Sequence, residues 1–368
     1  MKNTVTSNSA VVFKETLSRY KNEIDADLEV FAKNIVSSTD EQFGEYSAES
    51  MKVFCDVLSR GGKRIRGALA MVAYEMFGGK NNDVAIKAAR VMELIQTYLL
   101  VVDDVYDRSR TRRGLPSAHV MLEELHHSNH WKDDALHFGE TIAFNSGIIG
   151  NHLAMTIAAD LDVEPHIALR AIKLLNTNLQ ITGEGQANDV FNEVVETSSK
   201  RQIENVLVWK TAYYTFVNPL QFGATLAGAD NEELDRLLEY SLAAGRTFQI
   251  TDDILGTFGS EFESGKSPMD DMREGKRTLL ILHTLAYANK EDAYFLEHML
   301  GNHDLTQAQF KKCQDIIFKA GSLEFAHAEA TQSSDDAIRC VDEYWSKTHN
   351  EAAHFLKDLV QYLLVRKS

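Results

Sequence analysis

Proline, cysteine and long hydrophobic runs are scarce in this chain. Only 4 of its 368 residues are proline, so long segments carry nothing that would break a helix. Its cysteines, Cys55, Cys313 and Cys340, are widely spaced and match neither a metal-binding motif nor a disulfide framework. No run has the length and hydrophobicity of a transmembrane helix, and the N-terminus lacks the apolar core of a signal peptide. We therefore expect a cytoplasmic protein without an integral membrane segment.

Acidic residues outnumber basic ones, 54 to 38, which gives a net charge of −16. This balance argues against a nucleic acid as partner, and an anionic substrate would need a local cationic patch. Apolar residues recur at intervals of three and four, the periodicity of amphipathic helices. We predict an all-α protein with a flexible N-terminus (1–12) and one domain (13–368). Residues 12–36 are predicted to form a helix and residues 37–49 a polar loop.

An apolar helix that runs into three aspartates is the first chemical feature. Leu-Leu-Val-Val leads directly into Asp103, Asp104 and Asp107, and Gln96 and Leu99 share a helical stripe with the first and last of these. Two carboxylates one turn apart repel each other unless they face water or share a cation. Because the acids follow an apolar helix without polar spacing, we favour a cation. Hard oxygen ligands suit Mg²⁺ held together with substrate phosphates.

A second acidic stripe follows in the next half of the chain. Gln249, Asp252, Asp253 and Gly256 are spaced three, one and three apart and again lie on one helical face. Two such stripes on either side of a cavity would supply carboxylates to one metal cluster. One acidic stripe is a weak indication of a metal site. Two stripes, each following an apolar helix and accompanied by clustered Lys and Arg, are a strong one.

These motifs together resemble those of a known family. They are Gly-Gly-Lys-Arg-Ile-Arg (61–66), Asp-Asp-x-x-Asp (103–107), Thr-Arg-Arg-Gly (111–114) and Phe-Gln-Ile-Thr-Asp-Asp (248–253). In this order, from about Phe54 to Leu280, the chain resembles the trans-isoprenyl diphosphate synthases of the polyprenyl synthetase family. The likeness is to short-chain members, the geranylgeranyl and farnesyl diphosphate synthases. It implies a single large helical bundle around a central catalytic cavity, and a homodimer.

The resemblance also implies roles for individual residues. Isopentenyl diphosphate would be held by Lys63, Arg66, Gln96 and Arg113. The departing allylic diphosphate would be bound by Arg112, Lys210 and Lys266, with Asp189 positioning a lysine. Three Mg²⁺ ions would be bound by Asp103, Asp107 and Asp252, with Asp104 beside them in the catalytic motif. Thr211 and Gln249 would stabilise the carbocation through their oxygen dipoles. Residues 260–276, with Lys266 and Lys276, read as a loop that could close on phosphates.

The reaction implied is a condensation of isopentenyl diphosphate with dimethylallyl, geranyl or farnesyl diphosphate. The allylic C–O bond ionises, the isopentenyl double bond attacks the cation, and a proton is lost. Product length is then set by the depth of the pocket. Tyr98 lies roughly 7.5 Å from Asp103 along the helix axis, where its ring would stop a growing chain, while Leu99 is smaller. In the family an aromatic at this position alone is typical of twenty-carbon synthases, so we predict geranylgeranyl diphosphate, with farnesyl diphosphate as the alternative.

Other interpretations stay open. Asn188, Asp189, Asn192 and Glu196 approach the second metal motif of class I terpene cyclases, but that reading leaves Asp252 and Asp253 without a role. A non-catalytic regulatory subunit would be expected to have lost acids or cations, and here they are present. The histidines of residues 126–137 could bind zinc, although their spacing is irregular and the stretch reads as a surface loop. Gly256 replaces the third aspartate of the second motif and cannot bind a metal.

Overall fold

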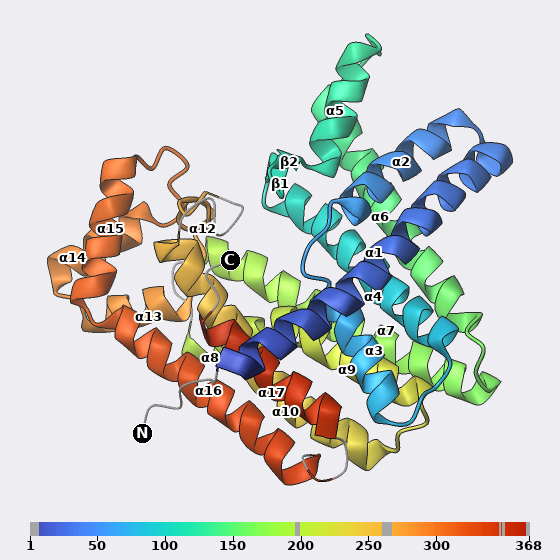
Figure 1. Ribbon diagram of the computed structural model, residues 1–368. Coiled ribbons are helices and arrows are strands. Elements are labelled where there is room, and N and C mark those ends of the chain that lie inside the picture. The colour runs from blue at the N-terminus through green and yellow to red at the C-terminus, as the bar shows by residue number, and fades with distance from the viewer. Residues whose placement is uncertain (1–6, 196–198, 260–266, 346, 348–349, 366–368) are drawn as a thin grey trace. The chain divides into compact units, whose positions relative to one another are not determined.

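The computed structural model describes residues 7–195, 199–259, 267–345, 347 and 350–365 (Figure 1). Helices make up nearly all of this described part, which confirms the all-α prediction. Contacts within the chain group it into two compact units. Unit 1 comprises the described residues of Met1–Phe13, Asn176–Asn218 and Asn231–Ser368, and unit 2 comprises Lys14–Leu175 and Pro219–Asp230. The single domain over residues 13–368 therefore stays a prediction.

Unit 2 carries the first acidic motif. Its elements are α1 (Ser7–Phe43, whose first residues belong to unit 1), α2 (Glu45–Ser59), α3 (Ile65–Met76), α4 (Asn82–Tyr106), β1 (Thr111–Arg112), β2 (Leu115–Pro116), α5 (Ala118–Ser128), α6 (Ala135–Ala159), the first part of α7 (Pro165–Val194) and most of α9 (Asn218–Leu226). Helix α4 packs against α2, α3 and α6. Phe54, Leu58 and Leu94 are fully buried in this core.

Local sequence explains where the two central helices of unit 2 begin. The side chain of Asn81 accepts a hydrogen bond from the backbone N–H of Asp83 and so caps α4. In the same way Asp134 accepts bonds from the N–H groups of Leu136 and His137 at the start of α6. Both caps fix the start of a helix of 25 residues, and the acidic motif lies at the opposite end of α4.

Unit 1 carries the second acidic motif. Its elements are the remainder of α7, α8 (Lys200–Val206), the π-helix η1 (Leu207–Val217), α10 (Asn231–Phe258), α12 (Asp270–Arg273), α13 (Leu279–Tyr287), α14 (Lys290–Met299), α15 (Gln307–Lys319), α16 (Ser322–Tyr344) and α17 (Asn350–Val365). Helix α10 packs against α16, α17 and η1. Ile250 of α10 joins Leu280, Leu296, Phe310 and Ile317 in one buried core.

Two sequence-based boundaries were wrong. The loop predicted for residues 37–49 is helical except at Gly44, because one residue with φ of 85° is enough to separate α1 from α2. Residues 7–11, assigned to a flexible N-terminus that ended at residue 12, already belong to α1. The stretch around the histidines, read as a surface loop, is helix α5 up to Ser128. Its His126 is buried and contacts the rings of Trp131 and Phe138.

None of the helices in the described part of the chain combines the length and the hydropathy that a bilayer crossing requires.

Candidate active site

The end of α4 places three aspartates in three different environments. The side chain of Asp103 keeps 24% of its surface exposed, whereas the side chain of Asp104 keeps 1%. Asp107 is the C-terminal cap residue of the helix and is half-buried. Asp103 and Asp107 lie one turn apart on one stripe, as predicted. Asp103 is partly open to solvent, Asp107 has one buried carboxylate oxygen, Oδ2, and Asp104 is fully buried.

Asp104 binds Arg112 rather than facing a ligand. The Nε atom of Arg112 donates to both carboxylate oxygens of Asp104, at 2.9 and 3.1 Å, and its Nη2 also bonds to Oδ1. The nearer oxygen of Asp103 is 3.8 Å from the same Nη2. Burial lowers the pKa of Arg112, but the carboxylates of Asp104, Asp103 and Asp107 outweigh it and raise the pKa above its usual value. Asp104 therefore orients a charged guanidinium beside Asp103.

A tight hairpin brings Arg112 back to the end of α4. Thr111 pairs with Pro116 and Arg112 with Leu115, which leaves Arg113 and Gly114 as a two-residue turn. Both turn residues have positive φ, 56° and 74°, as the commonest two-residue hairpin turn requires. The glycine of the Thr-Arg-Arg-Gly motif thus serves the turn. The two arginines of the motif have different partners: Arg112 binds Asp104, and Arg113 binds the glycine loop after α2.

Arg113 contacts the glycine loop that follows α2. Its Nη1 donates to the carbonyl oxygen of Gly61. A Cβ atom on Gly62 would lie 2.9 Å from Nη2 of Arg113, and Gly62 has a φ of 128°, so a side chain there would be both strained and crowded. The structure therefore brings the Gly-Gly-Lys-Arg-Ile-Arg and Thr-Arg-Arg-Gly motifs together, as the resemblance implied for an isopentenyl diphosphate site.

Charges around Arg113 are unbalanced. Burial and the neighbouring arginines Arg64, Arg112 and Arg66 lower its pKa to about 10, while Glu93 opposes the shift. The side chain of Arg113 is exposed, and the neighbouring arginines surround it with positive charge. Like charges gathered in this way are relieved by a bound anion. The side-chain oxygen of Gln96 is buried without a hydrogen-bond partner among the described residues, which also suits a polar ligand.

The basic run at residues 63–66 divides into two kinds of residue. Arg64 is buried, with Nη1 2.9 Å from Glu93 and Nε 2.7 Å from Asp25. Arg64 has a positive φ of 52° and is the N-cap residue of α3. Lys63 and Arg66 are half-buried. Arg64 therefore anchors the loop to α1 and α4, whereas Lys63 and Arg66 are the residues assigned to the diphosphate.

Tyr98 and Leu99 lie one to one and a half turns before Asp103, and both are half-buried. Burial raises the pKa of the Tyr98 hydroxyl, and Tyr106 adds to the shift. The ring of Tyr98 lies against α6, where a Cβ atom on Gly147 would be 3.2 Å from its Cδ2. Tyr98 of α4 therefore packs against α6, and its role in product length stays a prediction.

In unit 1, Lys210 reaches Asp189. Its Nζ donates to Oδ2 of Asp189 at 2.6 Å, and the two side chains keep 21% and 16% of their surface exposed. A Cβ atom on Gly185 would lie 2.2 Å from the backbone nitrogen of Lys210, so this glycine lets α7 approach η1 closely. The contact that the resemblance implied is present, and the anion that Lys210 binds stays a prediction.

Thr211, Gln249 and Asp253 form a chain of hydrogen bonds. Thr211 Oγ1 donates to Gln249 Oε1, and Gln249 Nε2 donates to Asp253 Oδ1, each at 2.7 Å. Burial raises the pKa of Asp253 well above its usual value, Gln249 lowers it, and Asp271 and Asp252 raise it further. Because Asp253 points inward, it orients Gln249 and is not placed to bind a metal from solvent. Asp252, its neighbour, is exposed.

The place of the missing third aspartate is filled from outside α10. A Cβ atom on Gly256 would lie 2.3 Å from Oδ2 of Asp271. Lys276 Nζ is 3.4 Å from the other oxygen of Asp271 and 2.7 Å from Glu274. A glycine at position 256 therefore makes room for the carboxylate of Asp271. The sequence alone assigns no role to Asp271, since only the fold brings its carboxylate to Gly256.

The donor set fits magnesium. In unit 2, Asp103 is partly open to solvent and Asp107 is half-buried, with its Oδ2 buried; in unit 1, Asp252 is exposed. Carboxylate oxygens are the kind of ligand that Mg²⁺ prefers. Among the described residues, no three His, Cys, Asp or Glu side chains are placed to hold a metal by themselves. Mg²⁺ sites that include substrate phosphates need only one or two carboxylates, so the arrangement agrees with a metal held jointly with substrate. Lys266, predicted to bind the allylic diphosphate, lies outside the described residues.

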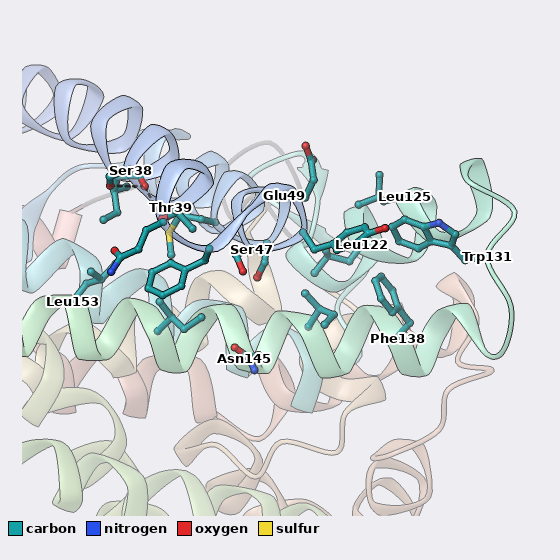
Figure 2. Close-up of a pocket in the computed structure, with 18 residues that line it drawn as sticks. Ser38, Thr39, Ser47, Glu49, Leu122, Leu125, Trp131, Phe138, Asn145 and Leu153 are labelled. Carbon is teal, nitrogen blue, oxygen red and sulfur yellow. Dashed lines mark hydrogen bonds between the residues drawn. The ribbon is translucent and has the colours of Figure 1, made fainter.

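Unit 2 also contains an apolar groove of about 780 Å³ (Figure 2). Phe43, Met51, Trp131 and Ile149 are among its lining residues, and no basic side chain is among the described residues that line it. Figure 2 shows Trp131 and Phe138 at one end and Leu153 at the other. A groove without cations does not suit a diphosphate, and none of the predicted substrate-binding residues lines it.

The comparison with known proteins agrees with these motifs. A family model described as "Polyprenyl synthetase" matches residues 48–317. The chain belongs to the polyprenyl synthetase family. The match includes both acidic motifs, the glycine loop, the hairpin and Lys210, and so confirms the resemblance.

Relatives of this polyprenyl synthetase family member cover most of its length. The geranylgeranyl diphosphate synthase of Saccharolobus solfataricus is 31% identical over 96% of this chain and 99% of its own. The geranylfarnesyl diphosphate synthase of Aeropyrum pernix is 29% identical over 74% of this chain and 81% of its own. A crystal structure of the geranylgeranyl pyrophosphate synthase from Corynebacterium glutamicum, complexed with isoprenyl diphosphate and magnesium, matches with a TM-score of 0.83. It is 26% identical and covers 97% of this chain and 98% of the other.

Proposed function

We propose that this protein is a short-chain trans-prenyltransferase that condenses isopentenyl diphosphate with allylic diphosphates and makes geranylgeranyl diphosphate as its main product. Family membership supports prenyl transfer, and the names of these relatives support a short-chain product. The main support for a catalytic role is that two cations lie beside aspartates of the motifs: Arg112 beside Asp103, and Lys210 beside Asp189. A regulatory subunit would have no need of them.

The first step is ionisation of the allylic diphosphate. The bond between the allylic carbon and the diphosphate oxygen breaks, and its electron pair leaves with the diphosphate. Bound Mg²⁺ would neutralise the charge that develops on that leaving group. We propose that Arg112, which binds Asp104, and Lys210, which binds Asp189, also stabilise this charge, because fixed cations of this kind act without reorganising during the reaction. We assign Asp103, Asp107 and Asp252 as the carboxylates that hold the metal.

The second step joins the two substrates. The double bond of isopentenyl diphosphate attacks the allylic cation and forms a carbon–carbon bond. Loss of a proton from the adjacent carbon then restores a double bond, and the released diphosphate accepts that proton. Arg113, Lys63 and Arg66 would hold isopentenyl diphosphate, for which the lowered pKa of Arg113 is the supporting observation. Thr211 and Gln249 would direct their oxygen dipoles at the cation.

Finer features belong to the same proposal. We propose three Mg²⁺ ions per site, which the structure with magnesium from Corynebacterium glutamicum supports only as to the kind of metal. We also propose a homodimer, for which the exposed Ile148 and Ile149 of α6 are supporting observations. A cytoplasmic location agrees with cysteines that are all free thiols.

Incubation of the purified protein with Mg²⁺ and radiolabelled isopentenyl diphosphate tests the proposal. Each reaction would contain dimethylallyl, geranyl or farnesyl diphosphate, and dephosphorylated products would be separated by chain length. We expect a twenty-carbon alcohol as the main product. A fifteen-carbon main product would support the farnesyl alternative. Release of diphosphate with a cyclic hydrocarbon would instead favour a terpene cyclase.

A further inference from the structure

Arg60, to which the proposed function gives no role, joins the end of α2 to the hairpin of β1 and β2. It is the C-terminal cap residue of α2 and lies directly before the glycine loop (residues 61–64). Its side chain keeps only 4% of its surface exposed. Arginine is seldom buried to this degree unless it is paired, so the partners of its guanidinium indicate what it does.

Two of these partners are backbone carbonyl oxygens on opposite strands of the hairpin. Nη1 of Arg60 donates to the oxygen of Pro116 at 2.7 Å and to the oxygen of Arg112 at 3.3 Å. Nε donates to Asp56 of α2 at 2.6 Å, and Nη2 donates to the sulfur of Met121 in α5 at 3.1 Å. Each of the three nitrogens therefore has a protein partner, which suits a residue that holds the hairpin and not one that binds a substrate.

The hairpin in turn reaches back to the glycine loop. Nη1 of Arg113 donates to the carbonyl oxygen of Gly61, the residue that follows Arg60. The same guanidinium lies over Gly62, where a Cβ atom would be 2.9 Å from its Nη2. One arginine from each segment thus donates to the backbone of the other. The end of α2 and the hairpin are therefore tied together in both directions.

We propose that Arg60 is a positioning residue for both diphosphates, although it touches neither. The inference rests on the proposed function and deepens it. The hairpin carries Arg112, assigned to the allylic diphosphate, and Arg113, assigned to isopentenyl diphosphate. Because Arg60 ties both strands of this hairpin to α2, a change in its guanidinium displaces both arginines. The reacting carbons of the two substrates meet only when both diphosphates are held in register, so such a displacement affects both substrates.

The test is Arg60→Lys, which keeps the positive charge but lacks the planar fork that bonds to several acceptors at once. We expect KM for isopentenyl diphosphate and KM for the allylic substrate to rise together. Each should rise roughly 3- to 10-fold, the size expected for the loss of one hydrogen bond. A KM does not depend on the amount of folded enzyme, so a loss of stability alone does not imitate this result.

Asp56→Asn is the matched control. Asp56 is exposed and binds the same guanidinium, but from α2 and not from the hairpin. If Arg60 acts through the hairpin, both KM values should stay unchanged in this variant.

Hydrogen exchange of the backbone amides in residues 110–117 follows the hairpin without any substrate. Exchange there should be faster in Arg60→Lys, because local opening becomes easier when the contacts that hold a segment are lost. It should be unchanged in Asp56→Asn.

Arg60→Lys combined with Arg113→Gln tests whether Arg60 acts through Arg113. In the double variant KM for isopentenyl diphosphate should rise by less than the product of the two single effects, because the guanidinium that Arg60 positions is gone. KM for the allylic substrate should rise as much as in Arg60→Lys alone.

A rise in only one of the two KM values overturns the inference while the proposed function stands, and so does an equal rise in Asp56→Asn. Unchanged hydrogen exchange in Arg60→Lys, or effects on KM for isopentenyl diphosphate that multiply fully in the double variant, would overturn it as well. Absence of any prenyl product from wild-type protein contradicts the proposed function itself. Hydrogen exchange then still shows whether Arg60 holds the hairpin, so the two failures are distinguished.

Discussion

Arg112 and Asp104 form a bidentate ion pair at the C-terminal end of α4, with Nε of the arginine 2.9 and 3.1 Å from the two carboxylate oxygens. Asp104 is fully buried, and Arg112 lies next to the half-buried Asp103. The three-aspartate motif is therefore not a set of three equal ligands. Its middle residue holds a cation in place, and its outer residues are left for metal and substrate.

Asp104→Asn should reduce stability, whereas Asp103→Asn should reduce activity. Removing the buried partner of Arg112 leaves a poorly paired charge, which costs about 3 kcal/mol of unfolding free energy. Asp103 is more exposed and only 3.8 Å from Arg112, so its replacement should leave the unfolding free energy nearly unchanged. The Asp103 variant should lose on the order of 100-fold or more in kcat. Urea titration and steady-state kinetics measure the two effects. Equal stability of both variants would contradict the division of roles.

Arg113→Gln should weaken the binding of isopentenyl diphosphate. Each charge-assisted hydrogen bond that is lost contributes about 1.5–3 kcal/mol, so KM for this substrate should rise roughly 10- to 100-fold. The KM for the allylic substrate should change little. Arg110→Gln is the matched control, because Arg110 is exposed and its Nη1 lies 2.7 Å from Glu123. A rise in KM for the allylic diphosphate alone would assign Arg113 to the other substrate.

Inorganic pyrophosphate should stabilise the wild-type protein without metal. The positive charges that lower the pKa of Arg113 repel one another, and a bound anion relieves that repulsion. The melting temperature should rise with pyrophosphate concentration in low salt and fall back as salt is added. Arg113→Gln should reduce the rise. An equal rise in the variant would show that pyrophosphate binds elsewhere.

Asp189→Asn should lower kcat more than it raises KM for the allylic substrate. Asp189 holds Lys210 by a contact of 2.6 Å and acts through it, so the lysine should become less well placed for the charge that develops on ionisation. We expect roughly a tenfold fall in kcat, and a larger one for Lys210→Gln, which removes the charge. Asp189→Glu keeps the carboxylate and should recover part of the rate. If Asp189→Asn and Asp189→Glu had the same kcat, the carboxylate would not be needed to position Lys210.

Removal of divalent ions should abolish activity and leave the fold intact. The described residues contain no metal site made by the protein alone, so no folding free energy is expected to depend on the ion. EDTA should therefore stop product formation, added Mg²⁺ should restore it, and the melting temperature should change little. A drop of many degrees with EDTA would reveal a structural metal instead.

The sequence predicted the helices because their apolar periodicity extends over many turns. It also located both acidic stripes, since residues three and four apart must share a face of any helix. The separate fate of Arg64 was not predictable, because the partners that bury it, Asp25 and Glu93, lie on other helices. The same holds for Asp271 at Gly256 and for Tyr98 at Gly147. In both cases a glycine marks the contact, but only tertiary structure identifies the side chain that fills the space.

Two further features, the π-helical segment η1 and the helix that carries His126, could be explained only once the structure was known. From the sequence we did not predict the π-helical geometry of η1 around Lys210, to which α7 comes close at Gly185 and α10 at Gly245. The histidines near residue 126 were misread because their polarity suggested a loop. Packing of His126 against Trp131 and Phe138 instead buries that end of α5.

The most direct test is a crystal structure of the protein with Mn²⁺, which replaces Mg²⁺ and scatters anomalously, and an unreactive allylic thiodiphosphate. We predict anomalous peaks within coordination distance of Asp103 and of Asp252, with all of the ions bound to the same diphosphate. Peaks at only one of these aspartates, or two aspartates that face separate cavities, would contradict a shared metal site and with it the prenyl-transfer mechanism proposed for this chain.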